Sequence, residues 1–313
     1  MRKATAGIII AALSLVTLSA CATSPDTCTD GLPASDIATS VTADDAQDAL
    51  PTTAKFATPL VASTASAAEI VEGDGPLVHD GDVVTSTVTI FDGTSGEAIN
   101  GGQITLQTSG GDLPLLRGAV CAHVGSRVAV VGPGSELLGT FASSFGVDDA
   151  QTVVLTLDID GDYLGRATGA DVLPQNGFPT VSLAPDGRPG ISFTGAEAPD
   201  DLRIETLIKG SGTTVQDGDQ VVVQYTEVDW ATHDVVDSTW ESARPAIVGT
   251  GDVVPGFQQA LVGATVGSQV LAVIPPSEGY GDSPPSGAGI TTDSTLVFVV
   301  DILGIAPAAS SDE

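Results

Sequence analysis

Basic residues are scarce in this chain. Only 10 of its 313 residues are Lys or Arg, against 40 Asp or Glu, and the formal net charge is −30. Nucleic acids and anionic lipid surfaces are bound through basic patches, so this imbalance argues strongly against either as a partner of the folded chain. We therefore expect no nucleic-acid partner. The acidic surface serves solubility and does not by itself indicate an activity.

Histidine and cysteine are also too few to suggest a metal centre. His79, His123 and His233 stand in no recurring ligand spacing, and we interpret them as ordinary surface residues. The stretch Asp158–Asp162 (DIDGD) resembles the start of an EF-hand loop, but the glutamate that should close the loop is missing. We expect no metal and no cofactor, and a calcium-binding surface protein has little support.

Long apolar runs are confined to the N-terminus. Arg2 and Lys3 precede an apolar stretch, Ala4 to Val16, which is typical of an export signal and too short to span a membrane. Leu18–Cys21 (LSAC) resembles the bacterial lipobox. It predicts a signal peptide over residues 1–20 and a lipid on Cys21, which would hold an exported protein on the outer face of the cell membrane. An ordinary signal peptide with a chance cysteine is the alternative.

Two more cysteines remain, Cys28 and Cys121. Cysteines of exported proteins are able to pair, but a sequence does not show whether two of them approach within bonding distance. Pairing therefore stays open here. If it forms, closing a loop of this length is worth about 4–5 kcal/mol in the chain-entropy model.

The middle of the chain contains an internal repeat. Three blocks recur in one order at offsets of 137, 142 and 143 residues: 70–84 against 207–221, 124–139 against 266–281, and 152–161 against 295–304. Such a pattern predicts two tandem domains of about 100 residues each. The predicted organisation is a signal peptide (1–20), a flexible tether (21–45), a first domain (46–161), a connector (162–200), a second domain (201–307) and a tail (308–313).

Both copies are rich in β-branched runs bounded by Gly, Asp and Pro, which predicts strands. One short helix is expected in each copy. In the second it begins at Pro255 and ends before Gly267; in the first it carries Leu115, Ala119 and Ala122 on one face. The connector is expected to form a short β-hairpin about Asp186–Gly187. The fold class is therefore α+β.

Tyr280 lies in a loop of turn-forming residues, Pro276–Gly287 (PSEGYGDSPPSG). A tyrosine there either anchors the loop to its own domain or contacts a ligand. The second copy resembles the FKBP-type peptidyl-prolyl isomerases through the blocks VVVQYTEV, VVDST, GTGDVVPGF, VGSQVLAVIPPSEGYG and STLVFVVDIL. The resemblance spans about Leu202–Ile305. The whole layout resembles the two-domain FKBP lipoproteins of Gram-positive, actinobacterial cells, which implies two tandem FKBP-like domains, each a curved antiparallel sheet wrapped around one short helix.

The resemblance also implies a site for the proline of an X–Pro bond. Tyr280 would donate a hydrogen bond to a substrate carbonyl, Asp237 would face the twisting amide, and Tyr225 would line the pocket. The substrate-binding residues that it implies are Val253 and Val254 (with a backbone N–H that binds a second carbonyl), Phe257 (the pocket floor), Ile290, Phe298, Val236 and Trp240.

Some positions depart from the family pattern. Val236 stands where an aromatic residue is usual, and the stretch 243–249 lacks a further aromatic, for which Trp240 would compensate. The first copy has Leu138, Val88 and Leu155 opposite Tyr280, Tyr225 and Phe298. With no hydroxyl at these positions, the first domain is expected to be a degenerate, non-catalytic copy.

Two functions remain open. The leading one is a lipid-anchored prolyl isomerase (rotamase) of the cell envelope, whose second domain helps exported, proline-containing polypeptides to fold and binds macrolides such as rapamycin. The alternative is a catalytically silent FKBP-fold peptide-binding or chaperone lipoprotein, which the missing aromatics favour.

Overall fold

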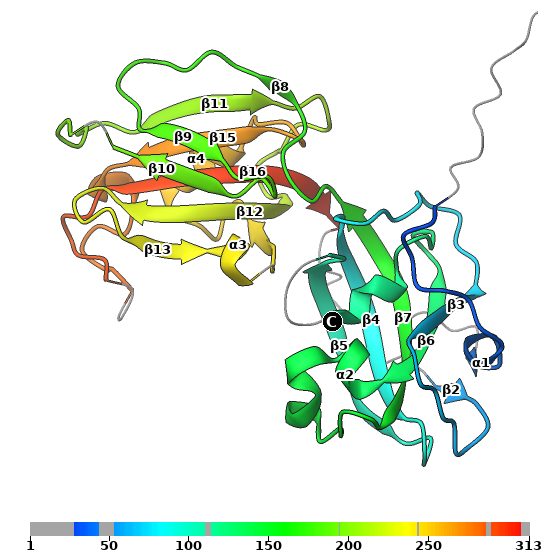
Figure 1. The fold of residues 1–313 in the computed structure, drawn as a ribbon. Coiled ribbons are helices and arrows are strands. Elements are labelled where there is room, and N and C mark those ends of the chain that lie inside the picture. Colours follow the sequence, from blue (N-terminus) through cyan, green and yellow to red (C-terminus); the bar gives the residue numbers. More distant parts are fainter. Residues whose placement is uncertain are drawn as a thin grey trace, which may run out of the picture.

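The computed structural model describes residues 28–43, 53–109, 114–193, 195–242, 244–285 and 289–307. The predicted signal peptide and Cys21 lie outside these residues. In the described ranges the chain forms two large antiparallel sheets with a few short helices (Figure 1). No helix within them is long and apolar enough to cross a membrane.

The first sheet has the strand order β3-β6-β7-β4-β5. Its strands are β3 (Ser66–Val71), β4 (Val83–Asp92), β5 (Ala98–Gln107), β6 (Arg127–Pro133) and β7 (Thr152–Tyr163). The helical segments on its inner face are η1 (Pro114–Gly118), α2 (Gly134–Leu137) and η2 (Gly139–Phe145). The helix expected here is wrong in kind: it is a single 3₁₀ segment, because Gly118 and the left-handed Cys121 (φ 71°) end it early.

The second sheet has the order β13-β12-β16-β15-β11-β8, and β14 also pairs with β12. Its strands are β8 (Ala170–Asp171), β11 (Arg203–Lys209), β12 (Gln220–Asp229), β13 (Val235–Ser238), β14 (Ala246–Gly249), β15 (Gln269–Ile274) and β16 (Leu296–Ala306). Its helical segments are α3 (Thr239–Ser242), α4 (Pro255–Leu261) and η3 (Pro276–Glu278). Helix α4 ends earlier than expected, because Val262 is extended and Gly263 has φ +87°.

The two sheets share one connectivity. Strands β3, β4, β6 and β7 pair in the same spatial order as β11, β12, β15 and β16. Each sheet has its own apolar core on its inner face, with Leu116 and Leu157 in one and Leu261 and Ile274 in the other. We call the first sheet with its packed segments the first unit (residues 28–163) and the second sheet with the connector the second unit (residues 164–307).

Each sheet is also covered on its outer face. The hairpin β9 (Thr180–Leu183) and β10 (Pro189–Ser192), formed by the connector, packs on the second sheet. On the first sheet lie α1 (Asp36–Thr39), β1 (Thr42–Ala43) and β2 (Ala54–Lys55). The tether expected over residues 21–45 is therefore wrong for residues 28–43, because Ala38 and Val41 are buried in this outer layer.

A disulfide joins Cys28 to Cys121, whose Cα atoms are 5.4 Å apart and which are separated by 93 positions in the sequence. It ties the N-terminal segment to the first unit. We expect the double variant Cys28→Ser/Cys121→Ser to lower the stability of the first unit by about 2–4 kcal/mol, because the unfolded chain regains the entropy of an open loop. Calorimetry should show the loss in the first unit's transition. A reductant should reproduce it in the wild type and change nothing in the variant; equal stability of the two proteins would contradict the expectation.

The equivalent places of the two sheets hold different buried polar pairs. In the first, the Arg127 guanidinium donates to the Asp158 carboxylate, with Nη2 to Oδ2 at 2.9 Å, and both side chains are buried. In the second, Gln269 donates to Asp301 at 2.7 Å, and the amide of Ala167 donates to its other oxygen. Burial without a cation in direct contact raises the pKa of Asp301 to about 6.

Candidate active site

An aromatic cluster lies on the inner face of the second sheet. Tyr225 comes from β12, Phe298 from β16, and Phe257 from the first turn of α4, which Pro255 opens. The Phe257 and Phe298 rings stack with centroids 4.6 Å apart, and the Tyr225 ring lies 6.1 Å from the first and 6.0 Å from the second. Both phenylalanines are buried, whereas Tyr225 is half-buried and presents its hydroxyl at the edge of the cluster.

The Tyr225 hydroxyl donates a short hydrogen bond to Oδ2 of Asp237. The other oxygen of Asp237 accepts from the amide of Ser238 at 2.8 Å, which fixes the orientation of the carboxylate. Burial, then the hydrogen bond and charge of Asp237, raise the pKa of Tyr225. Tyr225 therefore stays protonated, and its hydrogen bond holds the exposed Asp237 carboxylate beside the aromatic cluster.

Four half-buried residues form the rim of this cluster: Val253, Val254, Tyr280 and Ile290. Val254 is the N-cap of α4, and in the part of the chain that the structure describes its amide has no acceptor. Tyr280 follows η3 in a loop held by the amide of Gly281, which donates to the Pro276 carbonyl at 3.0 Å. Within the same described residues the Tyr280 hydroxyl makes no hydrogen bond. Burial, then Glu227 and Asp237, raise its pKa, so it remains a donor.

The two other residues implied by the family resemblance lie on β13 and α3. Val236 is half-buried in β13, where a bulge breaks the register with β12. Trp240 points away from the aromatic cluster, because α3 begins directly after β13 and turns its ring toward the connector, beside Gly187 and Arg166. The expectation that Trp240 replaces a missing pocket aromatic is therefore wrong.

Glu227 is a site residue that sequence reasoning missed. It lies two residues after Tyr225 on the same face of β12, directly opposite Asp237 on β13 and Phe298 on β16. The residue is only 4% exposed, and its Oε1 is buried without a hydrogen-bond partner among the residues that the structure describes. Burial, then the charge of Asp237, raise the pKa of Glu227 from 4.5 to about 7. The signal was available in the strand alternation, since Glu227 shares the inward face with Tyr225.

This carboxyl should make the second unit less stable as the pH rises. The folded protein holds the Glu227 proton more tightly than the unfolded chain, so the contribution of this group to stability falls between about pH 4.5 and 7. We expect Glu227→Gln to match the wild type at pH 4 and to exceed it at pH 8 by on the order of 2 kcal/mol. Urea unfolding followed by the fluorescence of Trp230 and Trp240, both in the second unit, measures this. A stability difference between the variant and the wild type that is equal at the two pH values would contradict this prediction.

The described part of the first unit has no such cluster at the equivalent positions. Val88, Leu138 and Leu155, which the repeat aligns with Tyr225, Tyr280 and Phe298, are all buried in the core of the first sheet. Their side chains carry neither hydroxyl nor aromatic ring. The first unit therefore has a closed aliphatic core where the second has an aromatic cluster with a polar rim.

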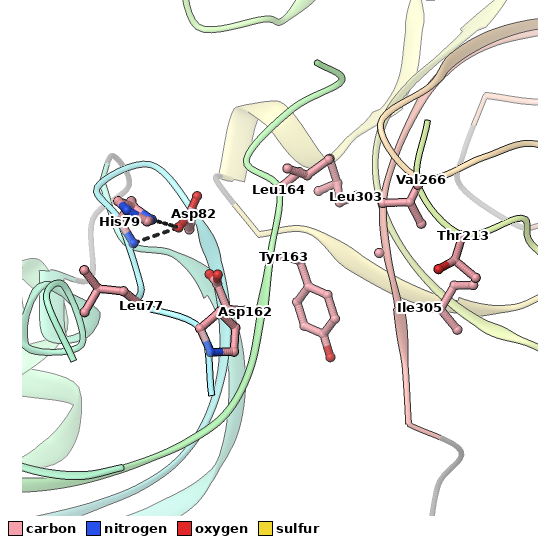
Figure 2. A pocket seen from close by; sticks show the side chains of 13 residues that line it. Leu77, His79, Asp82, Asp162, Tyr163, Leu164, Thr213, Val266, Leu303 and Ile305 are labelled. Carbon is pink, nitrogen blue, oxygen red and sulfur yellow. Dashed lines mark hydrogen bonds and ion pairs between the residues drawn. The ribbon is translucent and has the colours of Figure 1, made fainter. Parts of the chain in front are cut away.

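A separate cavity of about 670 Å³ lies between the two units. Figure 2 shows Tyr163 and Asp162 on one side of it, and Val266, Leu303 and Ile305 on the other. Burial, then the charge of Asp82, raise the pKa of Asp162 to about 7. Within the described part of the chain, no group of three or more His, Cys, Asp or Glu side chains is arranged to hold a metal ion.

Comparison with known proteins identifies one family, whose model matches residues within the second unit. Residues 211–303 match the family model of the FKBP-type peptidyl-prolyl cis-trans isomerases. An FK506-binding protein of Streptomyces anulatus is 33% identical over 120 residues, which cover 38% of this chain and 97% of that protein. A probable FK506-binding protein of Corynebacterium glutamicum is 32% identical over 117 residues, 37% of this chain and 97% of that protein. The crystal structure of FkpA from Escherichia coli matches with 30% identity and a TM-score of 0.32, covering 37% of this chain and 54% of that one.

Proposed function

Because the chain belongs to the FKBP-type peptidyl-prolyl cis-trans isomerases, we propose that its second unit accelerates the cis–trans isomerisation of X–Pro bonds in polypeptides. One observation carries the proposal. Three aromatic rings form an apolar cluster, and at its rim stand a protonated Tyr280 hydroxyl and a Val254 amide that has no acceptor among the described residues. Proline packs well on aromatic rings, and the two donors match the carbonyl oxygens on either side of it.

The chemistry needs no nucleophile and no cofactor. An X–Pro amide is planar through charge-separated resonance, and water on its carbonyl oxygen stabilises that resonance. Packing the proline on Phe257 and Phe298 removes this water, and donors at Tyr280 and Val254 hold the flanking carbonyls while the bond turns. Such a surface binds the twisted amide more tightly than the planar one, which is what lowers the barrier.

The required stabilisation is modest. The uncatalysed exchange takes tens to hundreds of seconds. A 10⁴-fold acceleration corresponds to about 5–6 kcal/mol at roughly 1.4 kcal/mol per factor of ten. Desolvation and two directed hydrogen bonds are of this order. The Asp237 carboxylate, held by Tyr225 and the Ser238 amide, faces the same space and opposes negative charge on the turning carbonyl.

The proposal extends to the rest of the chain. The shared strand order supports two tandem FKBP-like domains, the first a degenerate copy, since Val88, Leu138 and Leu155 fill its core. The sequence around Cys21 supports export and lipid attachment at the outer face of the cell membrane, where proline-containing exported polypeptides would be the substrates. The relatives named as FK506-binding proteins support macrolides such as rapamycin as ligands of the second unit.

A silent peptide-binding protein is the second candidate. The observation that favours it is the loss of pocket aromatics, since Val236 is aliphatic and Trp240 turns away toward the connector. A wider pocket would still hold proline segments without constraining the amide. Binding of a proline peptide with no acceleration of its isomerisation would favour this candidate.

Tyr280→Phe tests the catalytic proposal. We expect the variant to keep its fold and to lose about tenfold in kcat/KM for X–Pro isomerisation, the equivalent of one hydrogen bond in the transition state. The assay follows a Leu-Pro peptide with and without rapamycin, which should inhibit the wild type. The matched control is Tyr163→Phe, which removes a hydroxyl outside the aromatic cluster. Equal losses in both variants, or none in Tyr280→Phe, would contradict a role for the loop tyrosine.

A further inference from the structure

The buried Glu227 carboxyl has no role in the isomerisation chemistry described above. It is 4% exposed, and no described residue forms a hydrogen bond with its Oε1. A buried polar atom left unpaired costs the folded protein its desolvation energy, so such an atom in a binding site is either a defect or a contact reserved for a ligand. Its position on the inward face of β12 places it inside the site, between Asp237 and Phe298.

The surroundings of Glu227 are acidic. Asp237 faces it from β13, Tyr225 lies two residues before it on β12, and Tyr280 lies near it on the loop after η3. On β16 its neighbour is the uncharged Phe298. The charge interactions that shift the pKa values of these groups come from Glu227, Asp237 and the tyrosines, with no Lys or Arg among them. The site therefore presents two carboxyl groups to whatever lies on the aromatic cluster.

We propose that Glu227 is a specificity-determining residue, which makes the site favour X–Pro bonds whose X residue is Lys or Arg. This inference rests on the proposed isomerase function. The proposal places the proline ring on Phe257 and Phe298 and the X residue on the β13 side of the cluster, where Glu227 and Asp237 lie opposite each other. The cationic group of X would donate to the unpaired Oε1 and neutralise the local charge.

The physical chemistry favours a cation over any other donor. A hydrogen bond to an ionised carboxylate is stronger than one between neutral groups, and it is strongest where water is excluded. An approaching cation also favours the ionised form of Glu227, so binding should release a proton near neutral pH. The preference for a cationic X residue should therefore rise between pH 6 and pH 8.

The test compares Lys-Pro and Leu-Pro peptides of otherwise identical sequence, using the full chain. The variants are Glu227→Gln and, as a control for the loss of one negative charge, Glu241→Gln, which changes an exposed carboxylate on α3. The kcat/KM ratio of the two peptides is measured at pH 6 and pH 8, and again at high salt, which screens the long-range field of the acidic chain. Thermal melts confirm that each variant is folded.

We expect the wild type and Glu241→Gln to favour Lys-Pro on the order of tenfold at pH 8, less at pH 6, and Glu227→Gln to lose this preference. Turnover of both peptides with a ratio that Glu227→Gln leaves unchanged would overturn this inference and leave the proposed function standing. A wild-type preference that is absent at pH 8, or that high salt abolishes, would overturn it as well. No turnover of either peptide would overturn the proposed function, and this inference with it.

Discussion

Replacing Arg127 with methionine should destabilise the first unit by about 3–5 kcal/mol, because it leaves the Asp158 carboxylate buried without its cation. Domains are commonly stable by only about 5–15 kcal/mol, so this loss brings the first unit close to unfolding at room temperature. Calorimetry should show the unfolding temperature of the first unit falling by many degrees, while that of the second unit changes little. Unfolding of the second unit is followed separately by the fluorescence of Trp230 and Trp240.

The second sheet supplies the matched control for this variant. Arg127→Gln copies the arrangement of Gln269 with Asp301, in which the carboxyl tolerates burial beside an amide by raising its pKa. We expect it to cost clearly less than Arg127→Met, and the double variant Arg127→Met/Asp158→Leu to recover most of the stability, since no charge remains buried. A loss below about 1 kcal/mol in Arg127→Met would show that the ion pair is not a structural requirement of the first sheet.

Replacing Phe257 with alanine should cost the second unit about 3–5 kcal/mol and abolish isomerisation. The ring is buried and stacks on Phe298, so its removal leaves a cavity at the centre of the aromatic cluster. The same ring is the proposed floor for proline. Stability is measured by urea unfolding, and activity by isomerisation of a Leu-Pro peptide at a temperature where the variant remains folded.

Phe257→Leu separates the two effects. This variant should lower the stability of the second unit by less than about 1.5 kcal/mol, because leucine keeps most of the side-chain volume. Activity should still fall, since the flat ring that supports proline is lost. Full activity in a folded Phe257→Leu protein would contradict the assignment of Phe257 as the pocket floor.

Strands were easier to predict from the sequence than helices. The β-branched runs and the repeat mark the longest strands, because alternation and turn residues are local signals. The end of α4 was placed too late, since Ala264 continues the apolar spacing although Gly263 has already taken a left-handed conformation. The N-terminal segment was predicted to be a tether, because its partners, the outer face of the first sheet and Cys121, lie far along the chain.

The aromatic cluster and its rim were predictable as far as the family motifs reach. Tyr225, Phe257, Phe298 and the rim residues come together because their strands and helix are adjacent in the fold. The orientation of Trp240 was not predictable from the motifs. It depends on where β13 ends and α3 begins, which no motif specifies. Glu227 was overlooked because a glutamate in a strand is ordinarily exposed, although alternation puts it on the same face as Tyr225; its register with Asp237 and Phe298 agrees with that face.

Catalysis by the second unit is best tested by exchange NMR on a Leu-Pro peptide with a catalytic amount of the full chain, with the protein's own spectrum recorded alongside. We expect cis–trans exchange well above the uncatalysed rate, and peptide-induced shifts around Phe257, Tyr280 and Ile290 with none around Leu138 or Leu155. A folded protein that shifts at these residues yet leaves the exchange rate unchanged would contradict it and identify a peptide-binding protein instead.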